Sequence, residues 1–141
     1  MKMKFKSLAL VLSLFLFLAI EAPNLTHSSS TINWYGYNEG IALGKADEKK
    51  IFLHFYADWC HFCKEMEKDT FQNPSVIAYL KENFISIRVD FDREKEISSD
   101  YGVRGVPINL FITETGEQIG PIPGYIPSER FLLMLKNITL F

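Results

Sequence analysis

The chain contains only two cysteines, Cys60 and Cys63, and they are separated by two residues. The apolar run Ile51–Tyr56 precedes them and a helix-forming segment follows, so Cys60 is expected at the N-terminus of a helix. There the unpaired backbone N–H groups and the positive end of the helix dipole stabilise an anion. A thiolate is such an anion, and its stabilisation makes a sulfur both nucleophilic and a good leaving group. The spacing therefore indicates thiol–disulfide exchange.

Two other uses of such a cysteine pair are a purely structural disulfide and half of a zinc site. Structural zinc usually takes four ligands, and only His27, His54 and His61 could add to the cysteines. A C-x-x-C motif beside an alternating strand and helix pattern favours redox chemistry over both alternatives. We therefore expect a redox disulfide, no metal site and no cofactor.

Several residues near the cysteines could support this chemistry. His61 follows Cys60 directly, and a protonated imidazole there would favour the thiolate, although His61 is equally well explained as an exposed residue of the first helical turn. Trp59 and Phe62 are expected to form an apolar rim around the sulfurs that could bind extended substrate. His54 interrupts the apolar run and is either a core histidine or an acid/base group, since burial alone would favour its neutral form.

The length of 141 residues, with 48% of them apolar, is consistent with one domain that has a sizeable core. The formal net charge is −2, and the lysines and arginines form no basic stripe. This argues against a nucleic-acid partner. We expect a monomer.

The N-terminal segment has the pattern of a targeting sequence. Three lysines at positions 2, 4 and 6 precede an uncharged run, rich in Leu and Phe, at residues 7–20. The run is shorter than the about 20 apolar residues that comfortably span a bilayer, but no clean cleavage site follows it. We expect a signal peptide or N-terminal anchor at 1–22, a flexible linker at 23–31 and the folded domain at 32–141. The protein would then be periplasmic or secreted, or anchored to a membrane through residues 7–20.

The sequence pattern of the expected folded domain predicts alternating helices and strands. One helix is expected to begin at Cys60, and the others are expected over residues 34–50, 75–83, 92–101 and 127–135. Strands are expected over residues 51–56, 84–90, 108–113 and 118–122. Trp34 and Tyr37 are expected to pack the first helix onto the sheet. A parallel βαβ part followed by an antiparallel hairpin implies an α/β fold with a mixed central sheet and helices on both faces.

Two separate motifs, Phe55–Lys64 and Tyr101–Pro107, resemble the active-site and cis-proline segments of the thioredoxin fold family. The resemblance covers residues 34–135. Within that family, the pattern that continues through Glu65–Glu67, Thr70–Phe71 and Pro74 is most similar to the C-terminal periplasmic domain of DsbD. The resemblance implies a thioredoxin fold.

The resemblance also implies roles for individual residues. Cys60 would attack the substrate disulfide, and Cys63 would resolve the mixed disulfide; we expect Cys60 to be exposed and Cys63 shielded. The Val106–Pro107 bond would be cis and lie beside the disulfide, where the backbone before the proline pairs with the bound peptide. Many family members carry a buried acid six positions before the first cysteine, as a proton acceptor for the second thiol. In this chain that position is His54.

These features predict an exported thiol–disulfide oxidoreductase. Export places the cysteines in an oxidising compartment, where a reductase needs a source of electrons. We expect a disulfide reductase that acts on disulfide-containing proteins and is supplied by a membrane-borne or thioredoxin-like electron donor. An exported oxidant or isomerase, and a binding module without redox turnover, are the alternatives.

Overall fold

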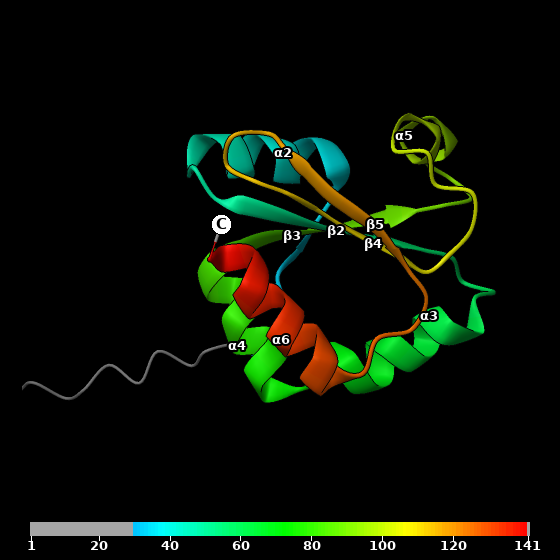
Figure 1. The fold of residues 1–141 in the computed structure, drawn as a ribbon. Helices are drawn as coiled ribbons and strands as arrows, with labels where there is room; N and C mark the ends of the chain where they lie inside the picture. The colour runs from blue at the N-terminus through cyan, green and yellow to red at the C-terminus, as the bar shows by residue number, and fades with distance from the viewer. Residues whose placement is uncertain (1–29, 141) are drawn as a thin grey trace, which may run out of the picture.

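A five-stranded sheet lies at the centre of the computed structural model, which describes residues 30–140 (Figure 1). Its strands lie in the order β1-β3-β2-β4-β5. They are β1 (Trp34–Tyr35), β2 (Lys50–Tyr56), β3 (Phe84–Asp90), β4 (Ile108–Ile112) and β5 (Gln118–Pro123). β3 runs parallel to β1 and β2, whereas β4 runs antiparallel to β2 and β5. The predicted mixed sheet is therefore confirmed.

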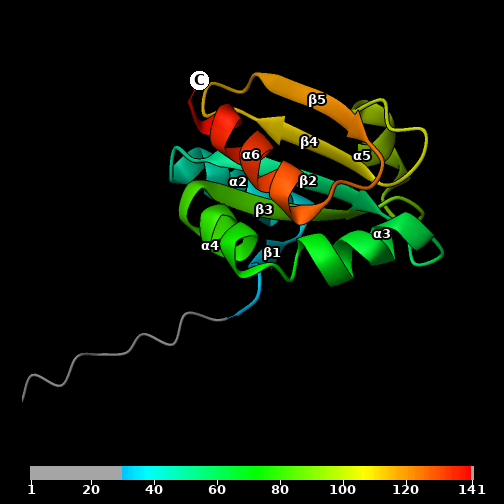
Figure 2. The ribbon, with the colours of Figure 1, turned by 60° about the horizontal axis from the view of Figure 1, so that its bottom comes forward.

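Helices cover both faces of this sheet, as predicted. They are α2 (Tyr37–Ala46), α3 (His61–Glu65), a π-helical continuation η1 (Met66–Thr70), α4 (Pro74–Asn83), α5 (Lys95–Asp100) and α6 (Ser128–Thr139). α2 and α5 lie over one face, and α3, α4 and α6 lie over the other (Figures 1 and 2).

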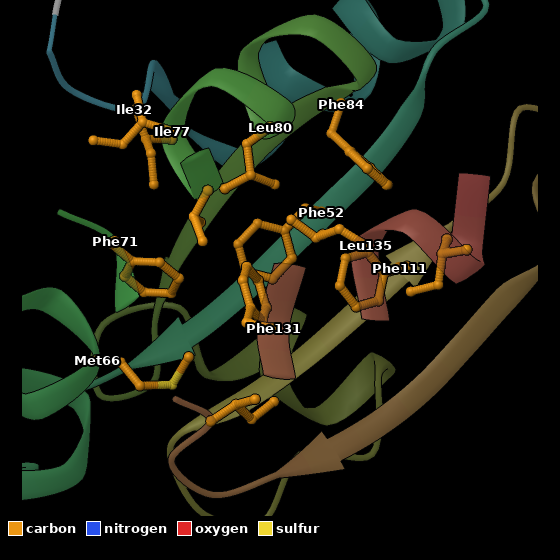
Figure 3. Packing of buried hydrophobic residues seen from close by; sticks show 13 residues of the cluster. Ile32, Phe52, Met66, Phe71, Ile77, Leu80, Phe84, Phe111, Phe131 and Leu135 are labelled. Atoms are coloured by element: carbon orange, nitrogen blue, oxygen red, sulfur yellow. The ribbon is translucent and has the colours of Figure 1, made fainter. Parts of the chain in front are cut away.

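Strand β2 contributes side chains to a core on each face, because successive residues of a strand point in opposite directions. Phe52 packs with Leu80 of α4 and Phe131 of α6 (Figure 3). Leu53 and Phe55 belong to the second core, on the side of α2. The alternation places His54 on the same face as Phe52, beneath the helices that follow the cysteines.

The break between η1 and α4 has a local cause. Asn73 is the N-cap of α4, and its Oδ1 accepts hydrogen bonds from the backbone N–H groups of Ser75 and Val76. Pro74 occupies the first helical turn, where a missing N–H costs nothing. The predicted helix over 75–83 is therefore confirmed and begins one residue earlier, at Pro74.

The predicted first helix was too long. Trp34 and Tyr35 form β1 and pair with Ser86 and Ile87 of β3, and α2 begins only at Tyr37. Two residues are too few to show the alternation of a strand. Trp34 consequently packs on the α4 and α6 side, against the expectation that it supports the first helix, whereas Tyr37 does pack on the α2 side.

The expected signal peptide or anchor, and nearly all of the expected linker, fall within residues 1–29, outside the described residues. Between residues 30 and 140, no helix has both the length and the apolar character needed to cross a membrane.

Candidate active site

Cys60 and Cys63 form a disulfide with an S–S distance of 2.17 Å and a Cα–Cα distance of 5.3 Å. Cys60 is the N-cap of α3, and its Sγ accepts a hydrogen bond from the backbone N–H of Cys63 at 3.1 Å. The predicted position of Cys60 at the helix start is confirmed. In the reduced protein the same N–H would donate to a thiolate, and hydrogen bonds to an ionised acceptor are stronger than neutral ones.

Exposure does not separate the two cysteines as expected. Cys60 is 5% exposed and Cys63 is 4% exposed, so both are buried in the disulfide form. They pack with Tyr56, Ala57, Phe91 and Val106. What distinguishes Cys60 is the hydrogen bond at the helix N-terminus, which Cys63 cannot receive because it lies inside the helix.

The predicted apolar rim, formed by Trp59 and Phe62, consists of two large exposed side chains beside the disulfide. Trp59 is 64% exposed and Phe62 is 58% exposed. The indole Nε1–H of Trp59 donates a hydrogen bond to Asp92 Oδ2 at 2.7 Å. Asp90 shapes the loop that carries Asp92, because its Oδ1 accepts the backbone N–H groups of Asp92 and Arg93. The sequence analysis placed Asp92 at the start of a helix over 92–101, whereas it lies in a turn before α5 (Lys95–Asp100). Its contact with Trp59 could not be read from the sequence.

His61 lies in the first turn of α3 and points into solvent. Its side chain is 77% exposed, and its Nε2 lies 3.9 Å from Glu65 Oε1. An influence on the Cys60 thiolate would therefore act largely through water.

The predicted cis-proline segment lies beside the cysteines, although more than 40 residues separate them in sequence. The Val106–Pro107 peptide bond is cis. Val106 packs against the cluster that contains both cysteines, and Pro107 is buried. The Pro107 carbonyl accepts a hydrogen bond from the backbone N–H of Gly124 at 3.0 Å, which links this segment to the end of β5.

His54 is fully buried, with no exposed surface. Its Nδ1 lies 3.0 Å from Asn109 Oδ1, and Asn109 is its cross-strand neighbour on β4. Burial lowers the pKa of His54 to about 4 against the opposing effect of the Asn109 hydrogen bond, and the positive charge of Arg88 lowers it further. His54 is therefore neutral near pH 7. No pattern in the sequence identified Asn109, because its pairing depends on the register between β2 and β4.

Arg88 on β3 is the cross-strand neighbour of His54 on β2, and its side chain contacts residues of several elements. Its guanidinium carbon lies 4.3 Å from the centre of the Tyr56 ring and 5.2 Å from that of Trp34. Its Nη2 is 3.0 Å from Glu67 Oε2 in η1. The cation thus connects β1, β2 and β3 to the helix that follows Cys63.

The described part of the chain was also searched for a metal site and for a pocket at the cysteines. Residues 30–140 contain no group of three or more His, Cys, Asp or Glu side chains placed to hold a metal ion. A pocket of about 740 Å³ lies between β5 and α6, and none of the predicted site residues lines it.

A helix-start C-x-x-C pair on this mixed sheet defines the class of thioredoxin-fold thiol–disulfide oxidoreductases. Residues 37–139 match the thioredoxin-like domain family, so the chain belongs to that family. The family resemblance drawn from the two sequence motifs is confirmed.

Comparison with individual proteins supports the same class. The chain is 30% identical over 128 residues to the thiol:disulfide interchange protein DsbD of Actinobacillus pleuropneumoniae, a match that covers 82% of this chain and 22% of the relative. The chain spans about a fifth of the length of this relative, and 18% of the length of a DsbD from Vibrio vulnificus.

Two solved structures extend the likeness to the fold. A thioredoxin from Thermus thermophilus has a TM-score of 0.72 at 27% identity, covering 78% of this chain and 88% of its own. The oxidised C-terminal domain of DsbD from Neisseria meningitidis has a TM-score of 0.59 at 28% identity, covering 71% of this chain and 89% of its own.

Proposed function

We propose that this protein is an exported disulfide reductase that uses Cys60 and Cys63 as its dithiol. The hydrogen bond from the Cys63 N–H to Cys60 Sγ is the observation that carries this proposal, since it favours a thiolate on Cys60. That thiolate attacks a substrate disulfide and forms a mixed disulfide, while one substrate sulfur leaves as a thiolate. Cys63 then attacks Cys60 Sγ, and the second substrate sulfur leaves. The substrate gains two electrons and the protein loses two.

The substrate in this proposal is a disulfide-containing protein in an extended conformation. The exposed Trp59 and Phe62 offer it an apolar surface. Val106, which lies against the disulfide cluster, offers backbone groups beside the sulfurs, next to Pro107. These groups flank the buried disulfide, which suits an extended polypeptide segment.

The proposed electron donor is a membrane-borne or thioredoxin-like protein that reduces the Cys60–Cys63 disulfide after each turnover. The likeness to the C-terminal domain of DsbD supports this proposal, because DsbD is named a thiol:disulfide interchange protein. The basic and apolar N-terminal pattern at residues 1–22 supports export to the periplasm or secretion, with or without an anchor. We propose that the exported protein acts as a monomer.

A redox titration against glutathione tests the direction of electron flow. We expect a potential close to the about −270 mV of thioredoxin, which suits a reductant. A potential close to the about −120 mV of DsbA would contradict the reductase and favour the oxidant or isomerase alternative. The Cys60→Ser variant provides the control: it should lose all turnover, whereas a binding module without redox chemistry would keep its function.

A further inference from the structure

A pocket of about 320 Å³ lies beside the cluster that contains the disulfide. Phe91 belongs to both features, because it lines the pocket and packs against the cluster of the two cysteines. Its backbone N–H donates a hydrogen bond to the carbonyl of Tyr56 at 2.8 Å, which holds it beside the segment that leads to Cys60. α5, which forms part of the pocket, lies at the same end of the sheet as α3 (Figures 1 and 2). The pocket is therefore continuous with the candidate active site.

The opposite wall of the pocket leads into the cis-proline segment. Val103 and Arg104 line this wall. Arg104 lies two residues before Val106, whose side chain packs against the disulfide cluster. Two residues of chain span at most about 7 Å, and an extended substrate rises about 3.3 Å per residue. A substrate segment that passes Val106 therefore reaches Arg104 within two or three of its own residues.

Hydrogen bonds and burial fix the wall that carries Arg104. The backbone N–H of Gly102 donates to the Ser99 carbonyl at 2.9 Å. The N–H of Val103 donates to the Ser98 carbonyl at 2.8 Å, and the Val103 side chain is buried in the core on the α2 side. Gly102 has a φ of +66°, which glycine adopts without the strain that a side chain would cause. The pocket is thus formed before a ligand binds.

The charge of the pocket is positive. Its lining includes Lys95 and Arg104 but no acidic residue. Among residues 30–140, no carboxylate forms an ion pair with either of these cations. In the preceding turn, by contrast, Arg93 lies 4.0 Å from a carboxylate oxygen of Asp58 and 3.4 Å from one of Asp90. The two cations of the pocket therefore remain available to an anionic ligand.

The size and lining of the pocket suit one side chain of a polypeptide. Small-molecule sites typically enclose about 300–1,000 Å³, and this pocket is at the lower end of that range. Phe91 and Val103 offer apolar surface to methylene groups, and Arg104 can bind a carboxylate through two N–H groups. A glutamate side chain combines these two chemical features.

We propose that this pocket binds an acidic side chain of the substrate polypeptide, within two or three residues of the cysteine that Cys60 attacks. Lys95 and Arg104 are the residues that determine this preference. The inference rests on the proposed reductase function and adds a substrate class to it, namely protein disulfides flanked by an acidic residue.

Symmetric peptide disulfides test the preference. Each half has one cysteine and carries Glu, Gln or Lys at one position, up to three residues before or after that cysteine. The reduced protein is mixed with each peptide, and chromatography of the released peptide thiol gives a second-order rate constant. Reduction by dithiothreitol corrects for the intrinsic reactivity of each peptide.

At one or more positions we expect Glu to raise the rate constant about 3- to 10-fold over Gln, and Lys to lower it. The effect is modest because an ion pair at an exposed site contributes only a few-fold. It should shrink toward unity in about 1 M salt, where the screening length falls to about 3 Å.

Variants of the two cations assign the preference to the pocket. Lys95→Gln combined with Arg104→Gln should reduce the ratio of Glu to Lys rate constants to less than about twofold, and the double change to Glu should invert it. Because the ratio is measured within each variant, a general loss of activity does not imitate a loss of preference. Lys45→Gln combined with Lys136→Gln removes the same charge from exposed positions outside the pocket and should keep the ratio.

The outcomes separate this inference from the function on which it rests. Equal rate constants for the Glu, Gln and Lys peptides would overturn the acidic subsite and leave the reductase intact. A preference that survives in Lys95→Gln with Arg104→Gln would overturn the assignment to this pocket. An effect of that variant on oxidised glutathione, with none on the Glu peptides, would overturn the polypeptide side chain as the occupant. Failure to reduce any of the peptides would instead overturn the proposed reductase and this inference with it.

Discussion

His54 shows what a single position reveals in sequence and in structure. Its place in an apolar run predicted burial, which is confirmed, and left open whether it is a core residue or an acid/base group. The sequence could not show the contact of His54 Nδ1 with Asn109 Oδ1, because this contact depends on the pairing of two strands that are far apart in the chain. The structure shows a buried imidazole in which Nε2 has no hydrogen-bond partner, and burial lowers its pKa.

The lowered pKa of His54 should make the protein less stable in acid. The native state keeps His54 neutral down to a pH of about 4, whereas the unfolded chain takes up the proton below its ordinary value of 6.5. The unfolded state therefore binds more protons between these values. We expect the free energy of unfolding to fall by about 3 kcal/mol as the pH drops from 6.5 to 4, and to gain nothing further from this group above 6.5.

Urea unfolding at a series of pH values, on the unaltered protein and on His54→Gln, measures this contribution. The difference in unfolding free energy between the two should change across that interval. A constant difference would show that His54 is already protonated in the native state or is still neutral in the unfolded chain.

His61 provides a second test at the level of one residue. A protonated His61 beside Cys60 would stabilise the thiolate and hence the reduced form. Because its side chain is 77% exposed and lies near Glu65, we expect His61→Ala to make the potential more negative by less than about 30 mV, which corresponds to less than about 1.4 kcal/mol. Glutathione titrations of both proteins give the comparison, with Phe62→Ala as the uncharged control. Equal potentials would leave His61 as a surface residue.

At the level of elements, hydrophobic patterning predicted most of the fold. The β-branched and apolar runs identified β2 and β3, and the helix expected over 75–83 corresponds to α4 (Pro74–Asn83). The two-residue strand β1 could not be predicted, because its strand character comes from pairing with β3 and not from its own pattern. The π-helical continuation of α3 also left no signal in the helical periodicity.

Helix α2 depends on a close approach to the sheet at Gly40. A Cβ at this position would lie 2.3 Å from Ile87 Cγ1 and 2.6 Å from Ile87 Cδ1. Ile87 is fully buried, so it cannot move aside freely. We expect Gly40→Ala to destabilise the protein by about 1–3 kcal/mol through overpacking. Thermal unfolding should show a clear loss, whereas Gly105→Ala, which meets no atom within 4 Å and lies outside the helices and strands, should change the stability by less than about 0.5 kcal/mol.

At the scale of the whole molecule, the candidate site is assembled from segments that the sheet brings together. The C-x-x-C and cis-proline segments were visible as motifs, because each has a recognisable local pattern. Asp92 and Asn109 were not, because their roles come from contacts across loops and strands. The sequence therefore predicted the reacting atoms better than the residues that hold them.

Trapping of mixed disulfides tests the central claim most directly. Reduced Cys63→Ser and Cys60→Ser variants are each incubated with an oxidised protein substrate, and the adducts are mapped by mass spectrometry. We expect Cys63→Ser to accumulate a mixed disulfide through Cys60, because only Cys60 Sγ receives the hydrogen bond at the helix N-terminus. Cys60→Ser should trap little or none. Efficient trapping through Cys63 in Cys60→Ser, with none through Cys60, would contradict the assignment of Cys60 as the attacking thiol.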